Sequence, residues 1–496
     1  MTHPANPILR GMYPDPSLCR VDGTYYLATS TFEYLPGIPI HSSTDLVHWR
    51  LAGHAIHDPA QFDFAGVGDS RGMFAPTIRH HEGLFYIACT QVDGGAVTGN
   101  FYVTARNVAG PWSRPVLLPD ARGIDPSLFF HEGRTWWIGC REVIEQTFEG
   151  ETEVWMRELD LELGELVGPE AVIWQRTQLR AVWAEAPHLY YREGWFYLVT
   201  AEGGTSFEHS VMVARSRDVA GPYEPFRSNP VLTHRHLGHG VPVQNVGHAE
   251  LVEGDDGEWW MVMLATRPIA GHHVLGRETH LARVTWEDDW PVVNAGHGGL
   301  DAPVAAPGHW SSTGVPSAAD FLAVRGFASF AEPIDTGLVL RSTGESLDSQ
   351  RPTAALLRRL TSTDSTLLIG LVAIEAGAVT GLVLRQNADF HVRVEVALAG
   401  EELSVRLIVR QGEDAEVAST TLANGPVALA ARLTPGGITW SAGASLQTVV
   451  ELGVTPLSML STETAAGFVG TTFGPYVAGR EGASAIFTSW TQDDHS

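Results

Sequence analysis

The stretch DPSLCRVDGTYYLATS, Asp15–Ser30, is the first of five related segments that decide the fold of this 496-residue chain. The other copies are APTIRHHEGLFYIACT from Ala75, DPSLFFHEGRTWWIGC from Asp125, APHLYYREGWFYLVTA from Ala186 and the looser HAELVEGDDGEWWMVML from His248. In each copy the head residue precedes a turn glycine by eight or nine positions. Each copy has the pattern of a strand, an Asp-Gly or Glu-Gly turn and a second strand, which predicts a β-hairpin.

The turn glycines recur every 50 to 63 residues, at Gly23, Gly83, Gly133, Gly194 and Gly257. Each period has room for a third and a fourth strand after the hairpin, and four strands per unit are typical of a β-propeller blade. The five copies therefore predict a five-bladed β-propeller over residues 1–305. The alternative is a β-sandwich with chance similarity between the copies, and the regular offset between head and glycine argues against it.

A second domain is predicted after residue 320, because 13 of the 15 tryptophans precede that point. The segment around it is rich in Pro, Gly, Ser and Ala and predicts a linker, which we place at 306–317. Beyond the linker, Phe390–Leu398 and Leu403–Arg410 alternate apolar and polar residues. We therefore expect an all-β chain whose second domain, 318–496, is a jelly-roll-like β-sandwich.

The composition excludes several classes of function. The formal net charge is −25 and no basic cluster occurs, so nucleic acid and an anionic membrane are not expected as partners. All 32 basic residues are arginine, which removes chemistry that needs a lysine. Three cysteines, Cys19, Cys89 and Cys140, have no close pair and indicate neither a disulfide framework nor a zinc site. With no apolar signal core at the N-terminus, we expect a soluble, cytoplasmic protein.

Carboxylates gather at the heads of the copies. The innermost strands of a propeller line its axis, so the heads should meet at one mouth. These positions are Asp15, Ala75, Asp125, Ala186 with Glu185 just before it, and His248. Ala75 and Ala186 show that the fold does not require an acid there. Alternatives remain: Asp15 and Asp125 could cap turns before proline, and His248 could be a hydrogen-bonded core residue.

Gathered acids without the spacing of metal ligands suggest glycoside hydrolysis. One carboxylic acid protonates the leaving oxygen, and one carboxylate activates water or attacks directly. A third carboxylate nearby would keep the acid protonated by repulsion between like charges. Aromatic residues near the mouth, such as Phe32 and Phe74, could pack on sugar faces, with ordinary core packing as the alternative.

The sequence resembles family 43 of the glycoside hydrolases, in the branch of β-xylosidases and α-L-arabinofuranosidases that carries a C-terminal β-sandwich. Five stretches carry the resemblance: Asn6–Trp49, GIDPSLFF (Gly123–Phe130), WAEAPHLYYREGWFYLVTAEGGT (Trp183–Thr205), VQNVGHAELVE (Val243–Glu253) and LGRETHLARVTWEDDWPVV (Leu275–Val293). The resemblance implies an inverting mechanism. It also implies that Asp15 is the general base, Glu185 the general acid, and Asp125 the residue that tunes the pKa of the acid and orients it.

The same resemblance implies the residues that hold the sugar. It places Arg277, Thr205, Phe32 and Phe74 in the pocket and His248 near the axis. A loop of the sandwich is expected at the rim of the site, with Phe473 as its candidate residue. The chain departs from the usual pattern, which has Asn where Tyr13 stands and Trp where Phe74 stands, and this leaves the preferred sugar open.

The expected activity is an exo-acting β-xylosidase that releases xylose from the non-reducing end of β-1,4-xylo-oligosaccharides. An α-L-arabinofuranosidase, a dual enzyme and a non-catalytic carbohydrate-binding propeller are the alternatives. We expect no required cofactor and no metal ligands; calcium near the axis has only His248 in its favour, and calcium prefers oxygen ligands. The expected partner is a small oligosaccharide, and the sequence leaves open whether the chain forms a homo-oligomer.

Overall fold

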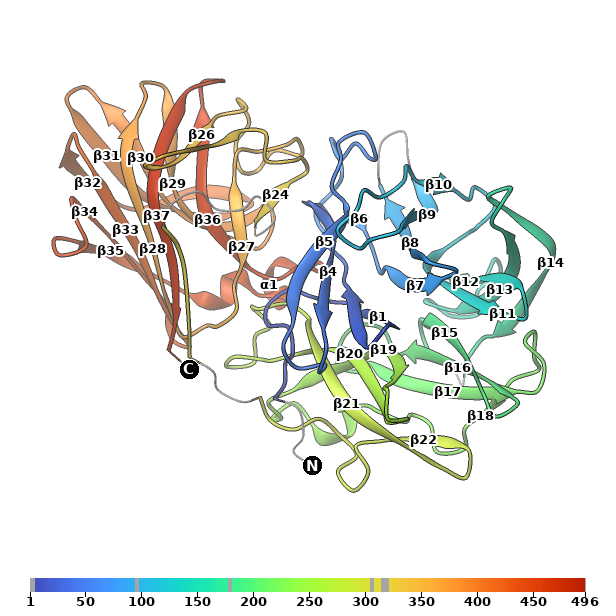
Figure 1. The fold of residues 1–496 in the computed structure, drawn as a ribbon. Helices are drawn as coiled ribbons and strands as arrows, with labels where there is room; N and C mark the ends of the chain where they lie inside the picture. Colours follow the sequence, from blue (N-terminus) through green and yellow to red (C-terminus); the bar gives the residue numbers. More distant parts are fainter. Residues whose placement is uncertain (1–4, 94–97, 177–180, 304–306, 314–320, 496) are drawn as a thin grey trace.

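The computed structural model describes residues 5–93, 98–176, 181–303, 307–313 and 321–495. Throughout these residues the chain is built of strands, as expected, and a propeller lies beside a sandwich (Figure 1). The described helical segments are three short ones: η1 (Arg235–Leu237), η3 (Leu457–Leu460) and α1 (Thr462–Ala465). None of the described helices is long and apolar enough to cross a membrane.

Five antiparallel sheets form the blades of the propeller. The first two blades hold β1 (Ser17–Val21), β2 (Thr24–Ala28), β4 (Gly37–Ser43) and β5 (Arg50–Ile56), then β6 (Gly72–Met73), β7 (Thr77–His81), β8 (Leu84–Val92), β9 (Gly99–Ala105) and β10 (Val116–Leu117). The third holds β11 (Ile124–His131), β12 (Arg134–Glu142), β13 (Thr152–Asp160) and β14 (Glu165–Trp174). The last two hold β15 (Glu185–Arg192), β16 (Trp195–Glu202), β17 (Ser210–Ser216) and β18 (Glu224–Pro225), then β19 (Gln244–Glu253), β20 (Trp259–Thr266), β21 (Glu278–Glu287) and β22 (Trp290–Val293).

The predicted hairpins are the inner pairs of strands of the five blades. At the first turn both Asp22 and Gly23 have positive φ, 48° and 77°, as a type I′ turn requires. The innermost strands close a ring, since β1 contacts β7 and β19, β11 contacts β7 and β15, and β15 contacts β19. The five-bladed propeller predicted from the repeat is therefore confirmed.

A buried network of polar side chains, here called the axial ring, joins the five innermost strands. Its members are Ser17, Arg79, Ser127, His188 and Glu250, one from each blade. The Arg79 and Glu250 side chains form an ion pair across the axis, and the Glu250 side chain is 1% exposed.

Hydrogen bonds of the axial ring run from each blade to the next. The backbone N–H of Ile78 donates to Ser17 Oγ (2.9 Å), and Arg79 Nε donates to the carbonyl of Leu128 (3.1 Å). His188 Nδ1 lies 3.3 Å from Ser127 Oγ and 3.8 Å from Glu250 Oε1. The backbone N–H of Leu18 donates to Glu250 Oε2 (2.9 Å), which returns the network to the first blade.

Two large sheets form the second domain. One contains β25 (Ala331–Ile334), β26 (Gly337–Arg341), β37 (Ser484–Asp494), β28 (Ser365–Ile374), β33 (Val427–Thr434), β34 (Gly437–Gly443), β35 (Val450–Thr455) and β23 (Gly308–Thr313). The other contains β3 (Tyr34–Leu35), β24 (Leu322–Val324), β27 (Leu356–Arg359), β36 (Thr472–Gly479), β29 (Ala378–Arg385), β30 (Phe390–Ala399), β31 (Glu402–Gln411) and β32 (Glu413–Ala423). Apolar side chains such as Leu382, Leu429 and Trp440 fill the core between the sheets.

The predicted linker needs a correction. Residues 308–313 form β23, which pairs with β37 along its whole length, so this part of 306–317 is a strand of the sandwich. Its Pro- and Gly-rich surroundings predict a loop, but backbone pairing with a neighbouring strand overrides that local tendency. Residues 306 and 314–317 of the predicted linker lie outside the described residues.

The two domains share backbone pairing and a buried charge cluster. Strand β3 of the propeller region pairs with β24 of the sandwich. Beside it, Asp69 Oδ1 accepts hydrogen bonds from Arg325 (2.7 Å) and Arg385 (3.0 Å), whose side chains are both 0% exposed. Burial and the nearby Asp69 charge raise the pKa of Glu33, in the same cluster, to about 7. The sandwich therefore supplies the cations that the propeller's acids need at this interface.

We expect Asp69→Asn to destabilise the protein by about 3 kcal/mol, because removing one partner of a buried ion pair leaves the other charge uncompensated. Thermal unfolding of the variant beside Asp335→Asn, a change of the same kind at an exposed position of the sandwich, measures this. Equal unfolding temperatures for the two variants would contradict the role given to the cluster.

Candidate active site

The heads of the repeats adopt an unusual backbone conformation. The φ angle is 55° at Asp15, 52° at Asp125, 51° at Ala186 and 50° at His248. In blades three, four and five the hairpin register also shifts at this point, which marks a β-bulge. A left-handed backbone at a non-glycine residue costs of order 1–3 kcal/mol and is found where a side chain must be aimed. The repeated bulge thus turns the head residues toward one end of the axis.

The head residues enclose a narrow cavity of about 80 Å³. It is lined by Asp15, Phe32, Phe74, Ala75, Ile124, Asp125, Glu185, Thr205, His248, Arg277 and Phe468. The three carboxylates predicted from the repeat are thus together in one cavity. So are Phe32, Phe74, Thr205, His248 and Arg277.

Asp15 is held as a carboxylate by its neighbours. Arg277 Nη1 donates to Asp15 Oδ1 (2.7 Å), Ser30 Oγ donates to Asp15 Oδ2, and His248 Nδ1 lies 3.7 Å from Asp15 Oδ1. Burial, at 4% exposed, would raise the pKa of Asp15, but Arg277, His248 and Ser30 outweigh it, so this pKa lies below its ordinary value. The carboxylate is therefore ionised at neutral pH.

Glu185 is in the opposite electrostatic situation. Burial, followed by the negative charges of Asp125 and Asp15, raises the pKa of Glu185 well above its ordinary value. The pKa of Asp125 is also raised, chiefly by burial, although its Oδ2 accepts a hydrogen bond from the backbone N–H of Ala186 (3.2 Å). That bond ties Asp125 to the residue next to Glu185. One cavity thus holds a carboxyl whose pKa is lowered, Asp15, and one whose pKa is raised, Glu185, which is the pairing that general base and general acid chemistry requires.

Arg277 links several of the residues that line the cavity through hydrogen bonds. Besides Asp15, its guanidinium donates to Thr205 Oγ1 (3.1 Å) and to the carbonyl of Phe468 (3.4 Å). It also lies over the rings of Phe32 and Phe468, 5.5 Å from each centroid. A further cavity of about 470 Å³ lies beyond, between the propeller and the sandwich, and Arg277 and Phe468 line both cavities.

The prediction for Phe473 is wrong. Phe473 lies within β36, is 0% exposed and packs edge-on against Trp490 in the core of the sandwich. The sandwich residue that lines the cavity is Phe468, whose ring stacks near Phe32 at a centroid distance of 6.1 Å. The sandwich therefore reaches the site, as expected, but through the segment that precedes β36.

The segment around Phe468 is fixed to the propeller by close backbone approach. The N–H of Phe468 donates to Ser70 Oγ (2.8 Å). A Cβ at Gly467 would lie 2.4 Å from Ser70 Oγ, and a Cβ at Gly470 would lie 2.4 Å from the carbonyl of Leu275. Both glycines are therefore needed for Phe468 to reach the cavity.

Sequence reasoning missed Ser30 and Phe468. Ser30 ends the first repeat copy, where nothing in the local pattern separates a ligand of Asp15 from an ordinary strand residue. Phe468 could have been found from the sequence, because Gly467 and Gly470 lie on either side of it and indicate close packing of the backbone. The resemblance instead suggested Phe473, five residues further along the chain.

Within the part of the chain that the structure describes, no group of three or more His, Cys, Asp or Glu side chains is arranged to hold a metal ion. His248 has Asp15 as its carboxylate neighbour, and Asp15 is already occupied by Arg277 and Ser30. These donors do not form the oxygen-rich set that calcium prefers, and the expectation that no cofactor is required stays a prediction. All three cysteines are free and buried.

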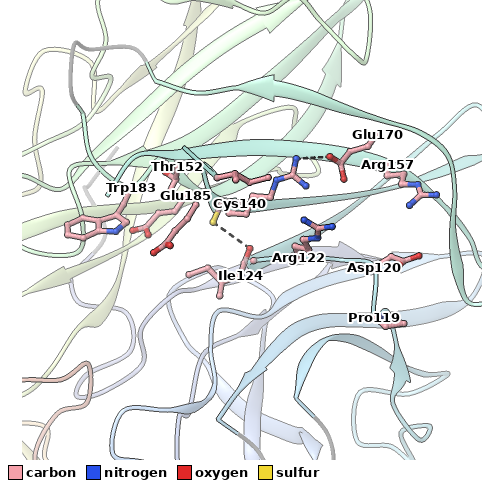
Figure 2. A pocket seen from close by; sticks show the side chains of 14 residues that line it. Pro119, Asp120, Arg122, Ile124, Cys140, Thr152, Arg157, Glu170, Trp183 and Glu185 are labelled. Atoms are coloured by element: carbon pink, nitrogen blue, oxygen red, sulfur yellow. Dashed lines mark hydrogen bonds and ion pairs between the residues drawn. The ribbon is translucent and has the colours of Figure 1, made fainter. Parts of the chain in front are cut away.

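On the side of Glu185, a larger cavity of about 900 Å³ opens over blade three (Figure 2). Its walls include Ile124 and Glu185, which also line the narrow cavity, and Trp183, Arg122 and Arg157. The site thus has a narrow end at the carboxylates and a wide end beyond Glu185.

Comparisons with known proteins agree with this site. Residues 4–291 match the profile of Glycosyl hydrolases family 43, and residues 327–491 match that of the Beta xylosidase C-terminal Concanavalin A-like domain. A xylosidase/arabinosidase of Butyrivibrio fibrisolvens is 50% identical over 299 residues, which are 60% of this chain and 57% of that protein. A non-reducing end alpha-L-arabinofuranosidase of Bacteroides ovatus is 43% identical over 58% of this chain and 53% of its own length.

The chain thus spans little more than half the length of these two relatives. Over the whole chain, the crystal structure of xylan beta-1,4-xylosidase from Bacillus halodurans superposes with a TM-score of 0.90. That match has 30% sequence identity and covers 99% of this chain and 100% of the other. With both domains matched and the carboxylates gathered in one cavity, the chain belongs to family 43 of the glycosyl hydrolases.

Proposed function

We propose that this protein is an exo-acting, inverting β-xylosidase that releases xylose from the non-reducing end of β-1,4-xylo-oligosaccharides. The observation that carries the proposal is the pair of carboxyls with opposite pKa shifts, Asp15 below and Glu185 above the ordinary value, in one cavity. The xylosidase names among the family relatives support the choice of sugar. Inversion is the general mechanism of this family.

In the proposed mechanism Asp15 is the general base and Glu185 the general acid. Asp15, ionised at neutral pH, takes a proton from the water that attacks the anomeric carbon. Glu185, protonated at neutral pH, gives its proton to the leaving oxygen as the glycosidic bond breaks. Asp125 keeps Glu185 protonated by charge repulsion and fixes its strand through the N–H of Ala186.

The other lining residues hold the sugar in this proposal. Arg277 and Thr205 offer hydrogen-bonding groups to its hydroxyls, and Phe32 and Phe74 form an apolar wall whose rings meet edge-on at 5.6 Å. His248 borders the same space next to Asp15. An aromatic wall with a few fixed polar groups is the usual make-up of a small-molecule site.

Exo action follows from the shape of the cavity. Arg277 is held by Asp15, Thr205 and the carbonyl of Phe468, and in this proposal it and Phe468 form the wall, between the narrow cavity and the 470 Å³ cavity, that stops the sugar chain after its terminal unit. The cavity of about 900 Å³ on the side of Glu185 receives the leaving group in this proposal. A substrate must therefore enter with its non-reducing end first.

An α-L-arabinofuranosidase, or an enzyme with both activities, is the second candidate. It is favoured by two relatives, one named xylosidase/arabinosidase and one named non-reducing end alpha-L-arabinofuranosidase. Of the two positions where the chain departs from the usual pattern, Phe74 lines the narrow cavity, whereas Tyr13 packs against the apolar cluster around Leu18. The cytoplasmic location stays a prediction from the sequence. The oligomeric state stays open.

A panel of nitrophenyl glycosides tests the proposal. We expect faster release from the β-D-xyloside than from the α-L-arabinofuranoside, and xylose as the first product from xylotriose. Proton NMR of the first turnovers should show the α anomer of xylose, as inversion requires. Release from neither pentoside would contradict the proposal and favour a propeller that only binds carbohydrate.

Glu185→Ala should nearly abolish hydrolysis of xylobiose, because general acid catalysis contributes typically about 10²–10⁴-fold. A dinitrophenyl xyloside should be partly spared, since its acidic phenol leaves with little protonation. Glu253→Ala, an exposed glutamate on β19, serves as the matched control and should match the wild type on both substrates. Equal losses on the two substrates for Glu185→Ala would count against Glu185 as the acid.

Asp125→Asn tests the role of the third carboxylate. Its charge raises the pKa of Glu185, so its removal should lower that pKa, and Glu185 should then lose its proton at lower pH. The alkaline limb of the pH profile of kcat/KM should therefore move to lower pH while the unfolding temperature stays near that of the wild type. An alkaline limb at the wild-type position would leave Asp125 as a turn residue or a sugar ligand.

A further inference from the structure

Trp183 is a large aromatic residue that the fold leaves exposed. It stands two positions before Glu185, is 43% exposed and lines the wide cavity together with that glutamate. Figure 2 shows Trp183 beside Glu185 at one end of this cavity, with Asp120, Arg122 and Arg157 toward the other end. Most tryptophans bury the greater part of their surface, so a half-exposed ring facing a cavity next to a catalytic acid requires a reason.

The structure holds Trp183 in place by its backbone. Its φ is 48°, a left-handed conformation that is costly for a bulky residue. The N–H of Trp183 donates to the carbonyl of Gly150 (2.8 Å). The carbonyl of the preceding residue, Val182, accepts a hydrogen bond from the N–H of Gly203 (2.8 Å). These bonds fix the backbone from which the indole projects, in the irregular segment just before β15 begins at Glu185.

Two glycines make room for the indole. A Cβ at Gly204 would lie 2.6 Å from Cε3 of Trp183, and a Cβ at Gly150 would lie 3.1 Å from its Cε2. Both glycines have positive φ, so each position suits glycine for its backbone as well. The ring is therefore packed against backbone at two points while it keeps an open surface toward the cavity.

The role of Glu185 as general acid indicates which part of the substrate contacts the open face of the Trp183 indole. The general acid stands on the leaving-group side of the bond that it protonates, so the wide cavity on its side receives the part of the substrate that departs. A flat aromatic surface there suits the apolar face of a sugar ring. We infer that Trp183 is the platform on which the first sugar of the leaving oligosaccharide stacks, an assignment that rests on the proposed function.

The far end of the wide cavity fits further neutral sugars. Arg141 is engaged by Glu153 and Glu170, so its charge is compensated within the protein. The charged residues that remain on the wall are two of each sign: Asp120, Glu142, Arg122 and Arg157. Balanced donors and acceptors suit hydroxyl groups better than a charged substituent. At about 900 Å³ the cavity is at the large end of the roughly 300–1,000 Å³ of typical ligand sites, which suits an oligosaccharide.

The test compares a substrate that has a sugar leaving group with one that has none. Xylotriose places two sugars in the wide cavity, whereas β-xylosyl fluoride loses only fluoride and leaves that cavity empty. Nitrophenyl xylosides are unsuitable here, because their ring could stack on the indole as well. Hydrolysis of the fluoride by the wild type tests the proposed β-xylosidase activity alone, because this substrate has no sugar that could contact Trp183.

We expect Trp183→Ala to lower kcat/KM for xylotriose roughly 10-fold or more, the size of effect found when a tryptophan anchor is truncated, and to leave kcat/KM for the fluoride unchanged. Trp183→Phe, which keeps an aromatic face, should recover most of the loss. Tyr191→Ala, at an aromatic residue on β15 that is 50% exposed and outside both cavities, should match the wild type on both substrates.

Equal losses on xylotriose and the fluoride would make Trp183 a structural residue and overturn the inference, as would an unchanged rate on xylotriose. If the wild type hydrolyses the fluoride normally and Trp183→Ala has either of these outcomes, only the inference falls. If the wild type hydrolyses neither substrate, the proposed function falls and the inference falls with it.

Discussion

The axial ring is the constraint on which the site depends. Five innermost strands converge on the axis. Their polar backbone and side-chain groups are buried there, and buried polar groups need hydrogen-bond partners. Arg79 and Glu250 meet this need with a buried ion pair, and His188, Ser17 and Ser127 complete the circuit. In four blades the head residue stands two positions before the member of the axial ring on its own strand, and in the second blade Ala75 stands four positions before Arg79. The strands that close the ring therefore also carry the head residues to the mouth. The carboxylates of Asp15, Asp125 and Glu185 thus converge in one cavity at the end of the axis.

Much of the site could be predicted from the sequence, because the repeat and the fold supply the geometry together. An offset of eight residues from a turn glycine locates Asp15 and Asp125 without any contact being known. The prediction that Phe473 lies in a loop at the rim of the site was wrong for a physical reason. The Gly474-Pro475 pair that follows it is typical of a turn, but β36 runs through it, since a Cβ at Gly474 would lie 2.1 Å from the carbonyl of Leu356. There glycine serves close packing between strands, and local chemistry cannot tell this use from a turn.

The second domain shows the same limit in another form. Alternation along Phe390–Leu398 predicts a strand with one buried face, and β30 is that strand, but His391, Arg393 and Glu395 on its polar face are each less than 10% exposed. They are buried among ion pairs with Asp414 and Arg406. Period-two patterning reports polarity and not exposure, so it cannot show that a polar face is covered. A second group of buried arginines, Arg325 and Arg385, pairs with Asp69 of the propeller and joins the sandwich to it.

Asp15 and Asp125 show how a repeat can give two residues different chemistry. Both begin the sequence DPSL, and their φ angles are within a few degrees of each other, 55° and 52°. Burial raises the pKa of each. At Asp15 the Arg277 guanidinium, the His248 imidazole and the Ser30 hydroxyl outweigh that effect. Asp125 accepts a hydrogen bond from the backbone N–H of Ala186, and burial together with the charge of Asp15 keeps its pKa raised. The blade therefore sets the direction of each side chain, and the neighbours from other blades set its charge. Because Arg277 comes from the last blade and Asp15 from the first, the charge of the base depends on closure of the propeller itself.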